Sequence, residues 1–264
     1  MRQSRDEIDL NYEHRLVLYA DIIGWRGASE SLKLEILLAA VNELKLAASS
    51  YNSAHRTRLL ESEARGEIKV NPMILDVQFA MFSDNFVFSM PASFGARILT
   101  VATPLVLNLL HRGFLVRGGI AIGNIYHKDN VVFGPALNQA VQIEQEYAVF
   151  PRILVSESSA IHIREVTSDL INDSMINDHM GCLVANPFAI SLDGPDEILI
   201  PALIQLFRPS EIDKVIDRNY AELLNLGQNE QSMKWLYMRN FIEGPAFQSS
   251  TKLKIAWERD HISR

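Results

Sequence analysis

Two aspartates lie where the sequence predicts that buried strands end. Asp21 follows the apolar run at 16–20 and precedes Gly24, and Asp84 lies at the tight turn of a predicted hairpin over 77–90. A carboxylate beside buried strands is unfavourable unless a positive group meets it, and a divalent metal ion is one such group. Asp21 alone also fits a cap of the helix that follows. The second acid, in a similar setting, favours a paired-carboxylate metal site.

Apolar patterns along the chain predict the elements that must position these acids. They are a strand up to Asp21, a helix within 29–50 with Ser29 or Ser31 as its N-cap, the hairpin at 77–90, a helix at 93–112 with a break near Pro104, a second hairpin at 115–133 with its loop at 127–130, a helix at 136–146 and a strand at 152–156. This order, β-α-β-β-α-β-β-α-β, predicts an α+β fold with a ferredoxin-like core and extensions.

The remainder of the chain has weaker patterns. We expect a core domain at 12–160 and a partly helical C-terminal extension at 161–264 that packs on the core or on a second chain. Two amphipathic helices are predicted within 209–241, with an interruption at 227–229, and a short strand at 183–185. No motif in the extension indicates a function.

Composition limits the class of protein. The chain has 264 residues, of which 48% are apolar and 22% charged, and this is enough apolar material for a folded core. Its formal net charge of −7 disfavours a general nucleic-acid-binding protein, which needs a basic surface. The single cysteine, Cys182, excludes an internal disulfide. The polar N-terminal residues and the lack of a long apolar run predict a cytoplasmic protein without a signal peptide or a membrane span.

Four motifs occur in an order that is specific as a set, although each is short. They are Asp21-Ile22-Ile23-Gly24 after a strand, Asp84 in a hairpin, Arg117-x-Gly119-Ile120 in a strand, and Gly134-x-x-x-Asn138-x-Ala140-x-x-x-Glu144 on a helix. In this order they resemble the class III nucleotidyl cyclase catalytic domain. The resemblance covers roughly residues 14–156, about half of the chain.

The resemblance implies a reaction and a metal site. In such enzymes the ribose 3′-oxygen of a nucleoside triphosphate attacks the α-phosphorus, and pyrophosphate leaves. Asp21, Asp84 and the Ile22 carbonyl would be ligands of two divalent ions, and oxygen ligands suit Mg²⁺ or Mn²⁺ rather than zinc.

It also implies how the substrate is held. Backbone N–H groups of a turn would meet the phosphates at a helix start. The residues of this turn are Ile23, Gly24, Trp25 and Arg26. Asn138 matches the position that orients the ribose, and each site would lie between the two chains of a homodimer.

Three positions depart from the pattern of the purine cyclases. Ala80 stands where adenylate-making members carry a lysine, and Val131 where they carry a polar side chain. A purine edge would then lack hydrogen-bond partners, at a cost of about 1–3 kcal/mol for each unpaired group. Gln142 replaces an arginine expected to stabilise charge on the α-phosphate.

Retained acids with altered base positions resemble the pyrimidine cyclases of bacterial Pycsar anti-phage systems. That resemblance implies cyclic UMP or cyclic CMP made from UTP or CTP, which activates a separately encoded effector. Tyr51 is a candidate for contacting the smaller base, and Arg56 for contacting the base or the phosphates, although each is equally well a surface residue. Two alternatives stay open: an inactive binding or dimerisation module, and a purine cyclase with atypical base recognition.

Overall fold

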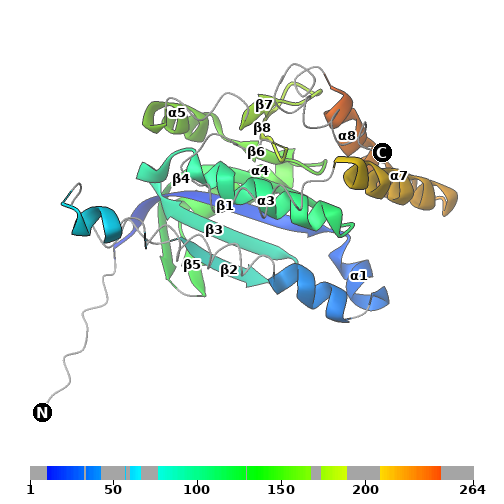
Figure 1. The fold of residues 1–264 in the computed structure, drawn as a ribbon, viewed down its shortest axis with the longest axis horizontal. Helices are drawn as coiled ribbons and strands as arrows, with labels where there is room; N and C mark the ends of the chain where they lie inside the picture. Colours follow the sequence, from blue (N-terminus) through cyan, green and yellow to red (C-terminus); the bar gives the residue numbers. More distant parts are fainter. Residues whose placement is uncertain are drawn as a thin grey trace, which may run out of the picture.

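The computed structural model describes residues 11–32, 34–42, 57, 60–66, 77–128, 130–167, 174–188 and 209–244. In this part of the chain a single sheet carries helices on both faces (Figure 1). The strands are β1 (Glu13–Ile23), β2 (Gln78–Phe82), β3 (Asn85–Pro91), β4 (Leu115–Lys128), β5 (Val131–Phe133), β6 (Ile153–Val155), β7 (Met175–Asn177) and β8 (Leu183–Ala185). The helices are α1 (Trp25–Ser31), the 3-10 turn η2 (Ala92–Phe94), α3 (Arg97–His111), α4 (Pro135–Tyr147), α5 (Glu157–Val166), α7 (Pro209–Asn225) and α8 (Asn229–Glu243), and residues 34–42 are also helical.

Strand β1 occupies the middle of the sheet. The strand order is β2-β3-β1-β4-β6-β8-β7, and β5 pairs with β4 outside this path. Both neighbours of β1 are antiparallel to it, whereas β4 and β6 are parallel. The order β2-β3-β1-β4 and the helices between these strands match the ferredoxin-like arrangement. The predicted α+β class is therefore confirmed.

The two faces of the sheet bury different residues of β1. Leu16, Leu18 and Ile22 alternate along the strand and belong to the largest apolar cluster, to which α3 and α5 contribute. Val17 faces the other way, into a cluster with Ala136 of α4. Because side chains alternate along a strand, Asp21 points to the same side as Val17, towards α4.

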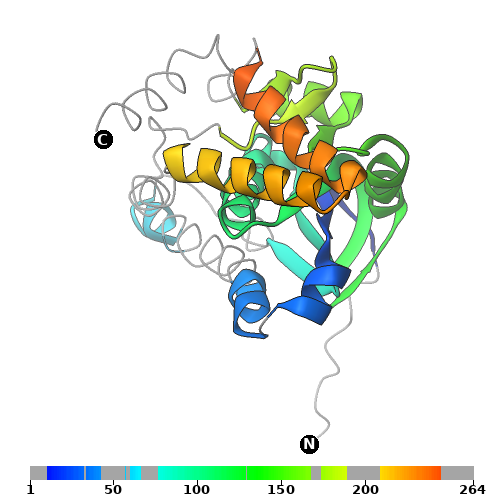
Figure 2. The ribbon, with the colours of Figure 1, turned by 90° about the vertical axis from the view of Figure 1, so that its right-hand side faces the viewer.

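The two C-terminal helices cover one end of the sheet, as Figure 2 shows for the orange helices α7 and α8. Their apolar residues form a third cluster with the start of β4 and with part of α3. Strands β7 and β8 lie in the same sheet as the core, because β8 pairs with β6. The predicted helix pair and the strand at 183–185 are confirmed, and the domain division at residue 160 stays a prediction.

Some predicted boundaries are wrong. Helix α1 begins at Trp25, so Ser29 and Ser31 lie inside it, and the chain becomes extended at Leu32 before it is helical again at 34. The predicted break near Pro104 is absent, because α3 continues through that position. In contrast, β4 ends at Lys128 and β5 begins at Val131, so the predicted second hairpin with its loop at 127–130 is confirmed. None of the described helices combines the length and apolarity needed to cross a membrane.

Candidate functional site

The register of β1 and β3 brings the two predicted acids to the same end of the sheet. Asp21 is paired with Asn85, the first residue of β3, and Asp84 directly precedes that strand. The backbone N–H of Ile22 donates a hydrogen bond to the carbonyl oxygen of Asp84 at 3.0 Å. The two acids are therefore neighbours in the fold, although 63 positions separate them in the sequence.

A short chain of hydrogen bonds orients Asp84. The Tyr19 hydroxyl donates to Asn85 Oδ1 at 2.5 Å, and Asn85 Nδ2 donates to Asp84 Oδ1 at 3.2 Å. Tyr19 lies two residues before Asp21, on the same side of β1. The hairpin turn is tight, and within it Ser83 adopts a left-handed conformation with φ 56°. Tyr19 and Asn85 thus position the Asp84 carboxylate.

Arg117 of β4 links Asp21 to a third carboxylate. Its Nε donates to Asp21 Oδ2 at 3.1 Å and lies 2.8 Å from Glu144 Oε1. Arg117 is paired with Asp21 in the sheet register, and Glu144 projects from α4, where its side chain is almost fully buried. A single N–H cannot donate fully to both acids. Glu144 Oε1 accordingly makes no hydrogen bond among the described residues.

Burial governs the protonation of this cluster. Burial raises the pKa of Asp21 above its ordinary value; Arg117 opposes the rise, and the nearby charge of Asp84 adds to it. Burial also raises the pKa of Glu144, again against the effect of Arg117. Burial and the three acidic charges raise the pKa of the Tyr19 hydroxyl to about 12. Asp21 and Glu144 thus share one guanidinium, and the charge of Asp84 lies nearby, which leaves the cluster suited to a further cation.

Asp21 and Asp84 fit one mode of divalent-metal binding. No group of three His, Cys, Asp or Glu side chains among the described residues is arranged to hold a metal ion. Mg²⁺, however, is usually bound by one or two carboxylates together with substrate phosphates and water. The two acids fit that mode, because the carboxylates around them outnumber the one guanidinium.

The predicted phosphate turn follows Asp21 directly. Gly24 has φ 84°, a left-handed conformation that suits glycine, and it precedes the first turn of α1. The Trp25 ring packs against the Phe114 ring, with centroids 5.7 Å apart, and Ile23 packs against the cluster under α8. Arg26 is exposed. The turn is thus fixed by packing on either side of the glycine.

The predicted ribose and phosphate residues of α4 do not point at these acids. Ala136, Ala140 and Glu144 form the buried stripe of the helix. Asn138 and Gln142 each lie two residues further along, about 200° around the helix, and both are exposed. Gln142 Nε2 donates to Glu146 Oε1 at 3.1 Å. Among the described residues, no hydrogen bond or ion pair joins Asn138 or Gln142 to the Asp21 and Asp84 carboxylates of the same chain.

The predicted base-binding residues are spread over the fold. Ala80 is buried in β2 opposite Val87, and Val131 is 55% exposed on β5. The structure does not bring Ala80 and Val131 into contact. Tyr51 and Arg56 lie outside the described residues.

Sequence reasoning assigned no role to several residues of this cluster. Arg117 and Glu144 lie inside two of the four motifs, but the motifs gave them no role. For Arg117, a single arginine in an otherwise apolar strand could have indicated a buried partner. Tyr19 and Asn85 lie close to Asp21 and Asp84 in the sequence, and nothing else indicated a role for them. Lys234 of α8, whose charge also acts on Asp21, lies 213 positions away in the sequence and could not have been found by pattern.

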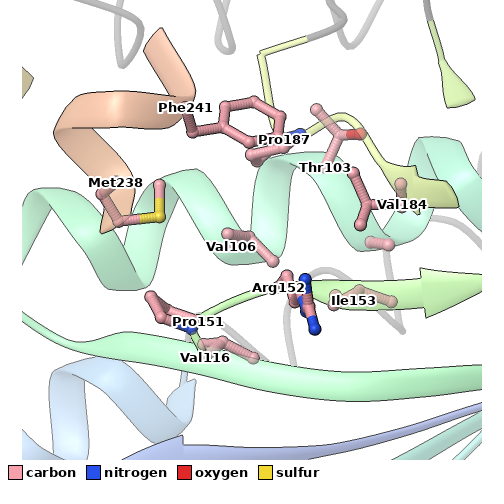
Figure 3. A pocket seen from close by; sticks show the side chains of 12 residues that line it. Thr103, Val106, Val116, Pro151, Arg152, Ile153, Val184, Pro187, Met238 and Phe241 are labelled. Atoms are coloured by element: carbon pink, nitrogen blue, oxygen red, sulfur yellow. The ribbon is translucent and has the colours of Figure 1, made fainter. Parts of the chain in front are cut away.

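A separate pocket lies on the other face of the sheet. It is lined by Val116 of β4 with residues of α3, β6, β8 and α8, among them Thr103, Ile153 and Phe241 (Figure 3). It admits the centre of a water-sized molecule over about 20 Å³, which is room for about one water molecule. Because it is that small and mostly apolar, it is not a nucleotide site.

The chain matches no protein-family model and no curated protein. Among solved structures it is similar to a bacterial light-regulated adenylyl cyclase, with a TM-score of 0.40 and 13% identity over 74% of this chain and 99% of that one. It is also similar to the catalytic core of a rhodopsin-guanylyl cyclase with converted specificity in complex with ATPαS (TM-score 0.39, 15% identity, 58% of this chain, 82% of that one). A third similar structure is the guanylate cyclase domain of RhGC from Catenaria anguillulae in complex with GTP (TM-score 0.38, 14% identity, 66% of this chain, 94% of that one). At these values the likeness transfers neither substrate nor site residues to this chain.

Proposed function

We propose that this chain is a nucleotidyl cyclase that converts a nucleoside triphosphate into its 3′,5′-cyclic monophosphate and pyrophosphate. The observation that carries the proposal is the juxtaposition of Asp21 and Asp84 at one end of the sheet, directly before the Gly24 turn. Two acids at strand ends beside the first turn of a helix suit a substrate that brings both phosphate and divalent metal.

Most residues of the cluster have a part in this proposal. Asp21 and Asp84, with the Ile22 carbonyl, would hold two Mg²⁺ or Mn²⁺ ions. When bound, these ions would activate the ribose 3′-hydroxyl and neutralise charge on the phosphates. Arg117 holds the Asp21 carboxylate in place. Tyr19, through Asn85, does the same for Asp84.

In the reaction, the bond from the 3′-oxygen to the α-phosphorus forms while the bond from the α-phosphorus to the pyrophosphate oxygen breaks, and the 3′-hydroxyl proton passes to water. The turn from Ile23 to Arg26 would hold the phosphates in line for this exchange. Asn138 would orient the ribose from the second chain of a homodimer, because it points away from its own chain's acids.

For the base we propose a pyrimidine, UTP before CTP. Ala80 and Val131 offer no hydrogen bonds from their side chains, so a purine edge placed against them would stay unpaired. Tyr51 could add a flat face and a hydroxyl for a smaller ring. By resemblance to the Pycsar cyclases, the cyclic nucleotide would signal to a separate effector in anti-phage defence.

The test is to incubate the purified chain and Mn²⁺ with ATP, GTP, CTP and UTP in separate reactions and to identify the products by mass spectrometry. We expect a cyclic product from UTP or CTP well above those from the purines. Dominant cyclic AMP or cyclic GMP would contradict the pyrimidine assignment, although the chain would still be a nucleotidyl cyclase. No pyrophosphate from any of the four would leave the binding or dimerisation module as the better account.

A further inference from the structure

The first turns of α8 reach the end of the sheet where Asp21 lies. Ile23, two residues after Asp21, packs against the apolar cluster that includes Trp235 of α8 and Leu115 of β4. Ile143 of α4 packs against the same cluster. A helix of the C-terminal segment is therefore built into the same end of the fold as the acids.

Lys234 precedes the buried Trp235 on this helix and is partly buried itself. Burial raises the pKa of Asp21, and the positive charge of Lys234 is one of the influences that oppose the rise. Lys234 makes no hydrogen bond or ion pair with any residue that the structure describes. Arg117, in contrast, is already held between Asp21 and Glu144.

The site therefore has one cation that is committed to acids and a second that has no acid of its own. Gln142 stands where the resemblance leads us to expect an arginine, and it is exposed and bonded to Glu146. A lysine ammonium is a mobile point charge with three donors, which suits phosphate oxygens. An anion that reaches the acids together with a divalent ion would meet this ammonium.

We infer that Lys234 binds the phosphate end of the nucleoside triphosphate at the site of Asp21 and Asp84, so that helix α8 completes the substrate site. The inference rests on the proposed function for the identity of the nucleotide. Its physical content is narrower: a polyphosphate bound with Mg²⁺ at the acids contacts an ammonium from the C-terminal segment.

Binding of inorganic tripolyphosphate with Mg²⁺, measured by isothermal titration calorimetry, tests this without depending on base choice or turnover. Lys234→Ala is expected to weaken tripolyphosphate binding about tenfold or more, because it removes a charged hydrogen bond. Lys234→Arg keeps a positive donor and is expected to retain most of the affinity. In the cyclase assay, Lys234→Ala should raise KM for the triphosphate more than it lowers kcat.

Lys214→Ala is the matched control, because Lys214 lies on the adjacent helix α7, is mostly exposed and pairs only locally, with Glu211 at 3.1 Å. It should bind tripolyphosphate as the wild type does, and circular dichroism should show all three variants folded. Unchanged binding by folded Lys234→Ala, or no binding by the wild type, would overturn the inference. Cyclic product with unchanged binding leaves the proposed function standing without Lys234. Tripolyphosphate binding that depends on Lys234, with no cyclic product from any nucleotide, would support the inference and contradict the proposed function.

Discussion

At the level of single residues, Asp21 and Asp84 are expected to be essential for turnover and dispensable for folding. Asp21 lies in a cluster with more carboxylates than guanidinium groups, so its loss relieves repulsion as well as removing the bond from Arg117. Asp21→Ala or Asp84→Ala should lower pyrophosphate release at least about 100-fold, since even partners of metal ligands cost 10–100-fold. Circular dichroism should show native spectra.

The control for this pair is Asp217→Ala, which removes an exposed acid from α7 that contacts Arg239. It should keep wild-type turnover. Substantial pyrophosphate release by either folded site variant, under the same Mn²⁺ concentration, would mean that the paired acids are not the metal ligands.

A second residue-level prediction concerns stability at low pH. His127 is almost fully buried, with Nδ1 2.8 Å from Ser89 Oγ, while Arg15 donates to the same hydroxyl at 3.0 Å. Burial and the charge of Arg15 lower the pKa of His127 to about 4. The unfolded chain takes up this proton near pH 6.5 and the folded chain does not. Stability from His127 is therefore full above pH 6.5 and is lost as pH falls towards 4.

The loss amounts to about 3 kcal/mol across that interval, because the pKa of His127 is lowered from 6.5 to about 4. Urea unfolding of the wild type and of His127→Asn at pH 7, 6, 5 and 4.5 measures it. We expect the free energy of unfolding to fall more steeply with acid in the wild type than in His127→Asn. Parallel curves would show that His127 is protonated alike in both states.

At the level of elements, the approach of α4 to β4 depends on Gly119. A Cβ added there would lie 2.7 Å from the Ala140 carbonyl oxygen and 2.7 Å from Ile143 Cβ. Gly119→Ala should therefore push α4 off the sheet and destabilise the fold by about 1–3 kcal/mol, because packed cores tolerate added volume poorly. The midpoint of urea unfolding checks this. Gly27→Ala, where a Cβ meets nothing within 4 Å, should be neutral or slightly stabilising.

Gly119→Ala should also lower turnover, since Glu144 and its contact with Arg117 are set by the position of α4. A Gly119→Ala protein as stable as the wild type would show that α4 has room to shift, and that the glycine serves another purpose.

The sequence predicted the elements better than their ends. A continuous apolar run identified β1, which is buried on both faces, and apolar patterns also identified the hairpin around Asp84 and helices α3, α4, α7 and α8. Boundaries failed where tertiary packing outweighs local preference. Helix α3 passes Pro104 because its apolar face, with Leu105 and Leu109 buried, offsets one lost backbone hydrogen bond.

Only part of the site could be predicted from the sequence, for a related physical reason. Asp21 and Asp84 interrupt apolar strands, and such interruptions are visible in a sequence. The contacts of Arg117 with Asp21 and Glu144 come from strand register and helix placement, which no local pattern encodes. The nearness of Lys234 to Asp21 arises only once the C-terminal segment packs against the core.

At the level of the whole molecule, the proposed ribose-orienting role of Asn138 requires a second chain, because of the direction of α4. The buried stripe of Ala136, Ala140 and Glu144 faces the sheet, and Asn138 is turned about 200° from it, on the exposed side of the helix. Asn138 therefore cannot reach the acids beneath its own helix. A second copy of the chain, related by a two-fold axis, would accept Asn138 at its acids and return the same residue to the first.

This arrangement predicts rescue between two inactive variants. Asp21→Ala and Asn138→Ala should each be inactive alone, because both sites of either homodimer lack one group. After subunit exchange at equal concentrations, half of the dimers would be mixed, and each mixed dimer would carry one intact site out of two. Pyrophosphate release should then recover to about a quarter of the wild-type rate per dimer. Exchange must be verified by mass spectrometry of differently tagged chains. If mixed dimers form and stay inactive, Asn138 acts within its own chain, and α4 must turn by about half a revolution in the working enzyme to bring it there.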